Sequence, residues 1–499
     1  MLPKLALVGA APGLVRPLAA LLLGVLAVPG FAPLAWFPLP ILSLALLFRL
    51  LRDSAPRAAF VGGWSYGLGL FLAGVSWIYI SLSTYGGMAM PLGLLATLLF
   101  CAFIALFPAV GLWLGARLAA PGWVRLTLAL PAAWALLEWT RGWLLGGFPW
   151  LALGYSQAPD SPLAGYAPLL GVYGVGLLAA LSAGLLASAR RSALVAAVCI
   201  WLAGWGLQQV QWTHPFGAPV TVALLQGNVP QEMKFRPEKL QDTLLDYARA
   251  VLATRARLIV LPETAVPVLR SQLSPAYLDL LGEHARRNRG DVVLGVPIDE
   301  GERYYNSVIS VGLSPEGHYR KVHLVPFGEF LPWGFDWILQ VLSIPMSDFS
   351  RGAADQPPLA VAGQRLAVNI CYEDAFGEER IAAARASTLL ANLSNDAWFG
   401  ASLAPQQHLQ IGAMRSLEAG RWQLRANNTG ITAILDDRGR VRAHLAPFTH
   451  GRLEASAQGR SGDTPYLLWG NWPALGLMLL LLGFALAHPR LRNLHSRNA

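Results

Sequence analysis

The sequence is poor in charged residues: only 13% of its 499 residues are Asp, Glu, Lys or Arg, whereas 54% are hydrophobic. A water-soluble globular enzyme carries about 25% charged residues, so this composition argues against that class and favours a membrane protein. Acidic residues are almost missing from positions 1–210, where only Asp53, Glu138 and Asp160 occur, and none follows Trp469. Two apolar regions therefore flank a polar one.

Cysteine is also scarce. Of the three cysteines, Cys101 and Cys199 lie in apolar stretches and Cys371 is alone in the polar region, so an intradomain disulfide is excluded there. The histidines show no zinc-hydrolase spacing, and we expect no metal, nucleotide or organic cofactor. The formal net charge of +9 arises in the apolar regions, from basic residues in the loops between hydrophobic stretches, which argues against nucleic-acid binding.

Eight stretches are candidates for membrane spans, because about 20 apolar residues are needed to cross a bilayer. We place them at 14–30, 34–51, 58–82, 90–116, 124–145, 166–189, 192–210 and 470–488. Basic residues precede the first span and follow the second, fourth, sixth and eighth, whereas the loops around 29–33 and 83–87 carry no charge. Since basic loops prefer the cytoplasm, we expect both termini to be cytoplasmic.

The polar region 211–468 then lies outside the cytoplasm, between seven spans in residues 1–210 and an eighth span with its tail in residues 469–499. Its short apolar runs alternate with helical patterns, which favours an α/β layered fold with polar side chains at strand ends. Strands are predicted at Val220–Gln226, Leu258–Leu261, Asp291–Val296, Ser307–Val311, Leu366–Ile370, Leu389–Leu393 and Thr432–Asp436. Helices are predicted at Pro237–Arg257, Pro275–Arg289, Gly377–Arg385 and His408–Glu418.

Three motifs at such strand ends, LPETA, YRKVHLVPFGE and NICYE, supply a carboxylate, an amine and a thiol in Glu263, Lys321 and Cys371. Acyl transfer needs these types: a nucleophile, a base that takes its proton and a cation that meets the developing oxyanion. Each residue alone also fits a structural role, since a lone cysteine is commonly an inert core residue. The combination favours a site, and we expect His323 to be structural.

The motifs, in the chain order Glu, Lys, Cys, resemble the carbon-nitrogen hydrolase (nitrilase) superfamily, whose domain is an αββα sandwich. Together with eight spans, further strings resemble the bacterial apolipoprotein N-acyltransferase family over nearly the whole chain. These strings are HLVPFGEF at 323–330, SNDAWFG at 394–400, NNTG at 427–430 and EWTRGWLLGGFPWLALGY at 138–155. The expected fold is a polytopic α-helical membrane protein with an extracytoplasmic nitrilase-like α/β domain.

This resemblance implies the last step of lipoprotein maturation, at the bacterial inner membrane with the catalytic domain in the periplasm. An acyl chain would pass from a phospholipid to the α-amino group of the diacylglyceryl-cysteine of an apolipoprotein, by a ping-pong reaction through a thioester. Glu263 would be the general base, Cys371 the nucleophile and Lys321 the cation that stabilises the tetrahedral intermediate. We expect a monomer.

The resemblance also marks Glu329 and Glu373 as acidic positions of the site, and Tyr372 and Trp398 as aromatic positions near the thiol. The backbone N–H of Tyr372 is the expected oxyanion donor.

The segment 330–349 is unusually apolar for an exterior loop. We interpret it as a lid at the bilayer surface, with Trp333, Phe335, Trp337 and Ile338 dipping into the interface. The alternative is that these side chains close the domain core.

Two other functions stay open. A membrane-tethered amidase or nitrilase would use the same three residues and pass the acyl group to water. A transporter or receptor would use the outer domain only to bind a ligand, which the few charges within the spans disfavour.

Overall fold

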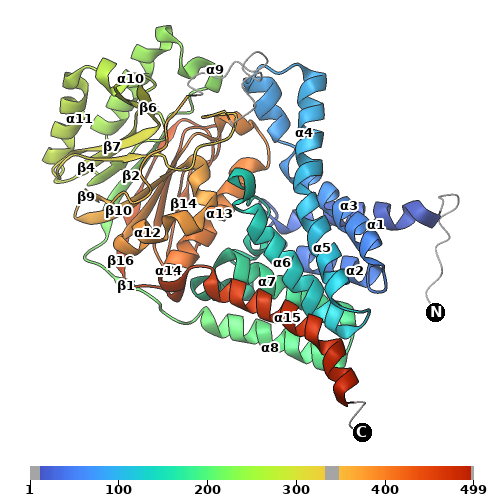
Figure 1. Ribbon diagram of the computed structural model, residues 1–499. Coiled ribbons are helices and arrows are strands. Elements are labelled where there is room, and N and C mark those ends of the chain that lie inside the picture. Colours follow the sequence, from blue (N-terminus) through green and yellow to red (C-terminus); the bar gives the residue numbers. More distant parts are fainter. Residues whose placement is uncertain (1–11, 332–347, 496–499) are drawn as a thin grey trace.

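In the computed structural model, which describes residues 12–331 and 348–495, a bundle of apolar helices lies beside a sandwich of two β-sheets (Figure 1). The bundle is built from both ends of the chain. Its helices are α1 (Pro12–Ala27), α2 (Pro38–Leu50), α3 (Pro56–Val75), α4 (Met90–Ile104), α5 (Leu106–Leu118), α6 (Leu130–Arg141), α7 (Ala167–Ser188), α8 (Arg191–Leu207) and α15 (Trp472–His495).

Three helical stretches in the described part of the chain have the length and hydropathy to cross a membrane: Pro56–Val75, Met90–Leu118 and Pro162–Ser188. Four shorter apolar helices accompany them: Leu14–Gly30, Pro38–Leu50, Arg191–Leu207 and Trp472–His488.

The stretch predicted to span 124–145 is helical: a π-helical turn, Arg125–Ala129, continues directly into α6, which ends at Arg141. The buried Arg141 guanidinium donates to the carbonyl of Trp150 at 2.7 Å, and Glu138 accepts the backbone N–H of Leu153 at 3.0 Å. These two charged side chains hold the following segment, around residues 150–153, against the end of α6.

Basic loops gather at one end of the bundle. The Arg125 side chain donates to the carbonyls of Ser54 and Ala119, both at 2.8 Å. The ring of Trp123 lies 5.8 Å from that of His488 and under the Arg190 guanidinium, so the loops after α2, α5 and α7 meet the last turns of α15. The loops at the opposite end of the bundle contact the sandwich.

Each sheet of the sandwich has six strands. The first has the order β15-β2-β3-β4-β7-β8, with β2, β3 and β4 parallel; the second has the order β14-β13-β12-β11-β10-β9, with β10, β11 and β12 parallel. The strands of the first sheet are β2 (Val220–Gln226), β3 (Leu258–Val260), β4 (Asp291–Gly295), β7 (Ser307–Gly312), β8 (Gly317–Arg320) and β15 (Gly451–Ala457). Those of the second are β9 (Leu359–Val361), β10 (Gln364–Ile370), β11 (Leu389–Ser394), β12 (Gln423–Asn427), β13 (Ala433–Leu435) and β14 (Val441–His444).

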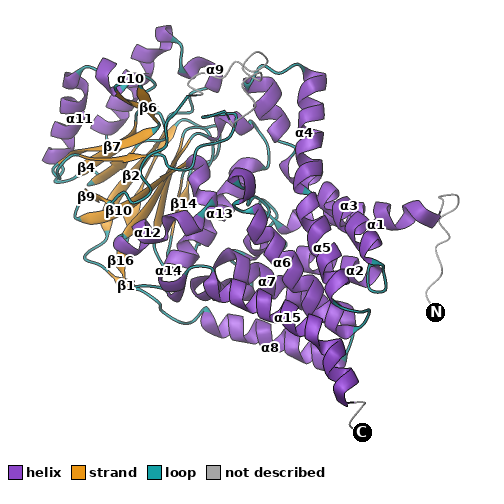
Figure 2. Ribbon diagram, in the orientation of Figure 1, coloured by secondary structure: helices purple, strands orange, loops and turns teal. Residues whose placement is uncertain are grey.

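Helices cover both outer faces of the sandwich (Figure 2). Helices α10 (Pro237–Leu252) and α11 (Pro275–Arg287) lie on the first sheet, and α12 (Ile381–Ala386) and α13 (Ala404–Ala419) on the second. Between the sheets, Val222 and Val260 pack with Val368 and Leu393 in one apolar core. The expected layered α/β domain is therefore confirmed. The short elements are α9 (Gln231–Lys234), α14 (Pro465–Trp469), and the ribbons β1 (His214–Pro215) with β16 (Arg460–Ser461) and β5 (Ile298–Glu300) with β6 (Arg303–Tyr305).

Helix α13 belongs to both parts of the molecule. The indole N–H groups of Trp77 and Trp150 donate to Gln407 Oε1 at 3.2 and 2.7 Å, and Glu418 Oε1 accepts the N–H of Val172 at 2.7 Å. Ile411 of the same helix is part of the apolar core of the bundle. The bundle and the sandwich thus share a helix layer.

Gly295 is where β4 passes closest to the loop after β3. A methyl carbon added there would lie 2.5 Å from Thr264 N and 2.8 Å from Glu263 Cα. We expect Gly295→Ala to lower the free energy of unfolding by about 1–3 kcal/mol, because the backbone must shift. Thermal unfolding of the purified protein checks this. Gly206→Ala is the control, because nothing lies within 4 Å of its added carbon; equal unfolding temperatures for both variants would contradict the argument.

Candidate active site

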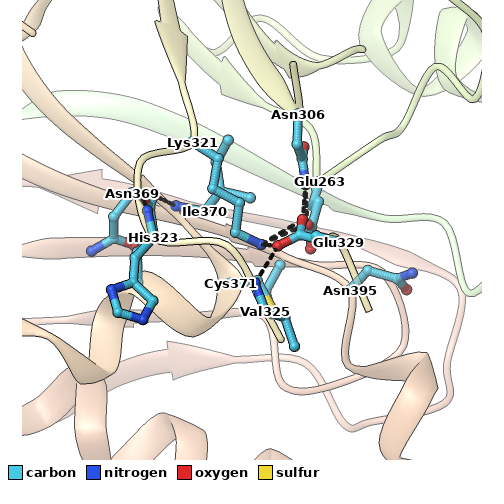
Figure 3. A network of polar contacts seen from close by, with 12 residues as sticks. Glu263, Asn306, Lys321, His323, Val325, Glu329, Asn369, Ile370, Cys371 and Asn395 are labelled. Atoms are coloured by element: carbon cyan, nitrogen blue, oxygen red, sulfur yellow. Dashed lines mark hydrogen bonds and ion pairs between the residues drawn. The ribbon is translucent and has the colours of Figure 1, made fainter. Parts of the chain in front are cut away.

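The three residues predicted to form a site follow three strands and meet at one edge of the sandwich (Figure 3). Glu263 lies in the loop after β3, Lys321 directly follows β8, and Cys371 directly follows β10 of the second sheet. Strands β3 and β8 run in the same direction, so their carboxyl ends share an edge. The sulfur of Cys371 faces the amine and carboxylates that the first sheet contributes.

Lys321 is the centre of the polar group. Its side chain is 1% exposed, and Nζ lies 2.9 Å from Glu329 Oε1 and 3.5 Å from Glu263 Oε1. Burial alone would lower the pKa of Lys321, but the Glu329 and Glu263 carboxylates together raise that pKa above its ordinary value. Lys321 therefore stays a cation throughout the physiological pH range.

Asn306 is a member of the site that sequence reasoning missed. Its Nδ2 donates to Glu263 Oε1 and to Glu329 Oε1, both at 2.7 Å, and so bridges the two carboxylates that hold Lys321. Asn306 precedes β7, which is antiparallel to β4, so the amino end of β7 lies at the edge where β3 and β8 end. Only the pairing of β7 with β4 reveals this.

Lys234, at the end of the short helix α9, is a second missed residue. It is buried, and its Nζ donates to the carbonyl oxygen of Glu263 at 3.0 Å. Burial lowers the pKa of Lys234 to about 8, against the opposing charges of Glu263 and Cys371. The main chain of Glu263 is thus held by a cation that lies beside the thiol.

Cys371 is 8% exposed, and its backbone is in the left-handed conformation, with φ of 51°. Burial raises the pKa of the Cys371 thiol above its ordinary value, the Glu263 carboxylate raises it further, and the Lys321 ammonium opposes the rise. The thiol is therefore protonated at rest near neutral pH. It needs a base, and Glu263 is the carboxylate that acts most strongly on it.

Glu373 lies close to Cys371 in sequence, and its carboxylate forms hydrogen bonds with groups of both sheets. Its carboxylate accepts the hydroxyl of Tyr319 at 2.8 Å and the backbone N–H groups of Val322 and Ile370, both at 2.7 Å. It therefore ties the end of β8 in the first sheet to the end of β10 in the second.

The two aromatic positions lie at the contact with the bundle. The hydroxyl of Tyr372 donates to the carbonyl of Gly147 at 3.1 Å, and its ring stacks near Trp150. The carbonyl of Trp398 accepts the hydroxyl of Ser81 at 2.8 Å. Tyr372 therefore contacts the bundle through its side chain, and Trp398 through its main-chain carbonyl.

His323 also connects the site to the bundle, because its Nε2 lies 3.0 Å from the carbonyl of Gly146. Its Nδ1 lies 2.9 Å from Glu379 and its ring stacks on Phe376. No group of three His, Cys, Asp or Glu side chains arranged to hold a metal occurs in residues 12–331 and 348–495.

The four lid residues, Trp333, Phe335, Trp337 and Ile338, lie outside the described residues. The segment that follows them is anchored at the site, since the N–H of Phe349 donates to the carbonyl of Glu329 at 2.9 Å.

An apolar cavity of about 690 Å³ opens between α3, α4 and the loop before α13. Its wall includes Leu72, Trp77, Ile80, Thr97, Leu98 and Leu403. A methyl carbon added at Gly400, which follows the Asp396–Phe399 turn, would lie 3.1 Å from Ile80. The cavity therefore adjoins the loop between β11 and α13.

Comparison with known proteins places both parts of the chain. The family model of the apolipoprotein N-acyltransferase N-terminal domain matches residues 23–185, and the carbon-nitrogen hydrolase model matches residues 221–466. The apolipoprotein N-acyltransferase of Nitrosomonas europaea is 52% identical over 95% of this chain and 98% of its own length, and that of Chromobacterium violaceum is 47% identical over 94% of each. The chain belongs to the apolipoprotein N-acyltransferase family. The resemblance drawn from the motifs is confirmed.

Two solved structures resemble about half of the chain each. A carbon-nitrogen hydrolase superfamily protein of Xanthomonas campestris matches with a TM-score of 0.36 and 16% identity, over 53% of this chain and 97% of that one. A nitrilase-superfamily amidase of Nesterenkonia matches with a TM-score of 0.35 and 22% identity, over 52% and 97%. The membership in the apolipoprotein N-acyltransferase family rests on the full-length relatives.

The opposing charges at Cys371 predict opposite pH shifts in two variants. Glu263→Gln removes a charge that raises the thiol pKa, so alkylation of Cys371 by iodoacetamide should begin at lower pH than in the wild type. Lys321→Met removes the opposing cation, so its alkylation should begin at higher pH. Labelling is read on the Cys371 peptide by mass spectrometry, because Cys199 is exposed and would react as well. Profiles that move together would contradict this electrostatic account.

Proposed function

We propose that this protein is an apolipoprotein N-acyltransferase, which moves an acyl chain from a phospholipid through a Cys371 thioester to the α-amino group of a diacylglyceryl-cysteine. One observation carries the proposal: a buried thiol faces a carboxylate and an ammonium group, in a chain whose full-length relatives bear that name. Its substrates are accordingly a phospholipid and an apolipoprotein.

In the first half-reaction, Glu263 takes the proton of the Cys371 thiol as the sulfur attacks the ester carbonyl carbon of the phospholipid. The carbonyl electrons move to oxygen, and Lys321 stabilises this negative charge together with the N–H of Tyr372. The C–O bond of the ester then breaks, and Glu263 gives the proton to the oxygen of the leaving lysophospholipid, which becomes a hydroxyl group. The pKa of the thiol, raised by burial, supports a base-assisted attack over a preformed thiolate.

In the second half-reaction, the α-amine of the diacylglyceryl-cysteine attacks the thioester carbon, and Glu263 accepts the proton that the amine loses. The C–S bond breaks and the thiolate regains that proton. Glu329 and Asn306 act by holding Lys321 and Glu263 in place, and Glu373 acts by joining the two strand ends.

The arrangement in the membrane follows from the charges. Basic loops collect at the end of the bundle opposite the sandwich, and basic loops prefer the cytoplasm. The protein therefore crosses the inner membrane eight times with both termini inside, the sandwich (211–468) lies in the periplasm, and one chain suffices.

A membrane-tethered hydrolase is the second candidate, because the same thiol, base and cation would also release an acyl group to water. The apolar cavity favours a lipid donor in both cases. Only the acceptor separates these two functions.

Intact-mass spectrometry decides between them. After incubation with a defined phospholipid, the wild-type protein should gain one acyl mass on Cys371, and Cys371→Ala should gain none. A diacylglyceryl-cysteine peptide should remove this mass and appear as the N-acylated product. Release to water alone would identify a hydrolase, and a wild-type protein that binds lipid without any adduct would contradict both functions.

The cavity predicts a dependence on acyl length. Thr97 is 5% exposed and lines the cavity, whereas Leu99, on the same helix, is 59% exposed. We expect Thr97→Phe to slow acylation of Cys371 by a C16 phospholipid at least about tenfold and by a short-chain phospholipid much less, because each buried methylene contributes about 0.8 kcal/mol. Leu99→Phe is the control. Equal effects of the two variants, or equal effects on both lipids, would exclude the cavity as the acyl site.

A further inference from the structure

Two of the motifs, SNDAWFG and NNTG, have no role in the chemistry above, yet both converge on one buried carboxylate. Asp396 is 1% exposed. It accepts the hydroxyl of Ser394 at 2.9 Å and the side-chain amide of Asn427 at 2.6 Å, and it faces Nδ1 of His408 at 3.0 Å. A buried carboxylate needs a partner cation and hydrogen bonds, because its transfer out of water costs several kcal/mol of free energy.

His408 connects this carboxylate to the nucleophile. Its Nε2 lies 3.2 Å from the carbonyl oxygen of Cys371, and the side-chain amide of Asn392 donates to the same oxygen at 3.1 Å. A neutral imidazole carries one N–H and can donate only one of its two bonds. Since both His408 nitrogens face oxygen acceptors, an imidazolium satisfies the site and a neutral ring does not.

The groups that face His408 come from three segments of the chain. Asp396 faces it from the turn before α13, and Cys371 offers only its carbonyl. From the bundle, His408 meets the uncharged ring of Trp150 at 5.7 Å. Burial alone would raise the pKa of Asp396, but the positive charge of His408, helped by Arg425 and Ser394, lowers that pKa below its ordinary value.

The backbone at Cys371 explains what the pair does. Its φ of 51° is a left-handed conformation that a residue with a Cβ adopts only when its surroundings hold it there. In that conformation the residue directs its sulfur at Glu263 and Lys321 from the start of the 3-10 helix Cys371–Ala375. The carbonyl of Cys371 is the group through which the surroundings can fix this geometry.

We propose that Asp396 and His408 form a charged positioning pair that fixes the carbonyl of Cys371 and thereby aims its thiol during acyl transfer. The pair is a positioning device, because neither residue touches the reacting atoms. This inference deepens the proposed function and rests on it.

The first test is the rate of Cys371 acylation by a C16 phospholipid in single turnovers, followed by intact mass. Asp396→Asn keeps the shape but removes the charge, and His408→Gln keeps a donor but cannot be a cation. Both should lower the maximal acylation rate about 10- to 100-fold while the lipid concentration for half-maximal rate changes less than about twofold. Gln410→Leu is the matched control, since this buried α13 residue bonds only the bundle, at Ala32 and Ala158.

The outcomes separate the two proposals. A wild-type protein that forms no adduct removes the proposed function. If the wild-type protein is acylated, two results overturn the positioning pair. One is that Asp396→Asn and His408→Gln are acylated as fast as the wild type, and the other is that Gln410→Leu is as slow as they are.

The second test uses no lipid and does not depend on the activity of any variant. In ¹⁵N-histidine-labelled wild-type protein, the His408 signal, assigned by its loss in His408→Gln, should show two protonated ring nitrogens at neutral pH. A His408 with one unprotonated nitrogen at that pH overturns the proposal, even if the variants are slow.

Discussion

The burial of one ammonium group, that of Lys321, organises the edge of the sandwich. An ion taken out of water costs several kcal/mol unless opposite charges and hydrogen bonds surround it. Here Glu263, Glu329 and Asn306 supply them, from three separate segments of the first sheet. Those segments must fold together for the charge to be compensated, so the base and the cation of the site are placed by the same interaction.

Compensation of Lys321 leaves little positive potential for the thiol. Burial and the Glu263 carboxylate outweigh the Lys321 ammonium, so the pKa of Cys371 is raised. A protonated thiol is a poor nucleophile and resists oxidation. In the proposed reaction, the thiol is thus inert until a substrate carbonyl and a base act on it at once.

The sequence predicts those parts of the site that local pattern controls. Glu263, Lys321 and Cys371 follow apolar strands, so the motif and its position were visible together. Asn306 and Lys234 were not, because strand pairing and a four-residue helix bring them to the site.

The same limit applies to the fold. The seven predicted strands exist, whereas β12, with the sequence QLRAN, was missed because its polar side chains are buried between parts of the protein. The helix predicted at 124–145 ends at Arg141, whose guanidinium binds backbone carbonyls of the following segment. In both cases buried partners satisfy polar groups that the local sequence makes look exposed.

Polar side chains of α13 also explain why the bundle and the sandwich keep one orientation. An apolar contact tolerates sliding, whereas a hydrogen bond fixes atoms in register. Gln407 binds two indoles and the carbonyl of Gly74, and Glu418 accepts the backbone N–H of Val172. His408, between them in sequence, reaches the main chain of the nucleophile. One helix therefore sets both how the sandwich sits on the apolar bundle and where the main chain of Cys371 lies.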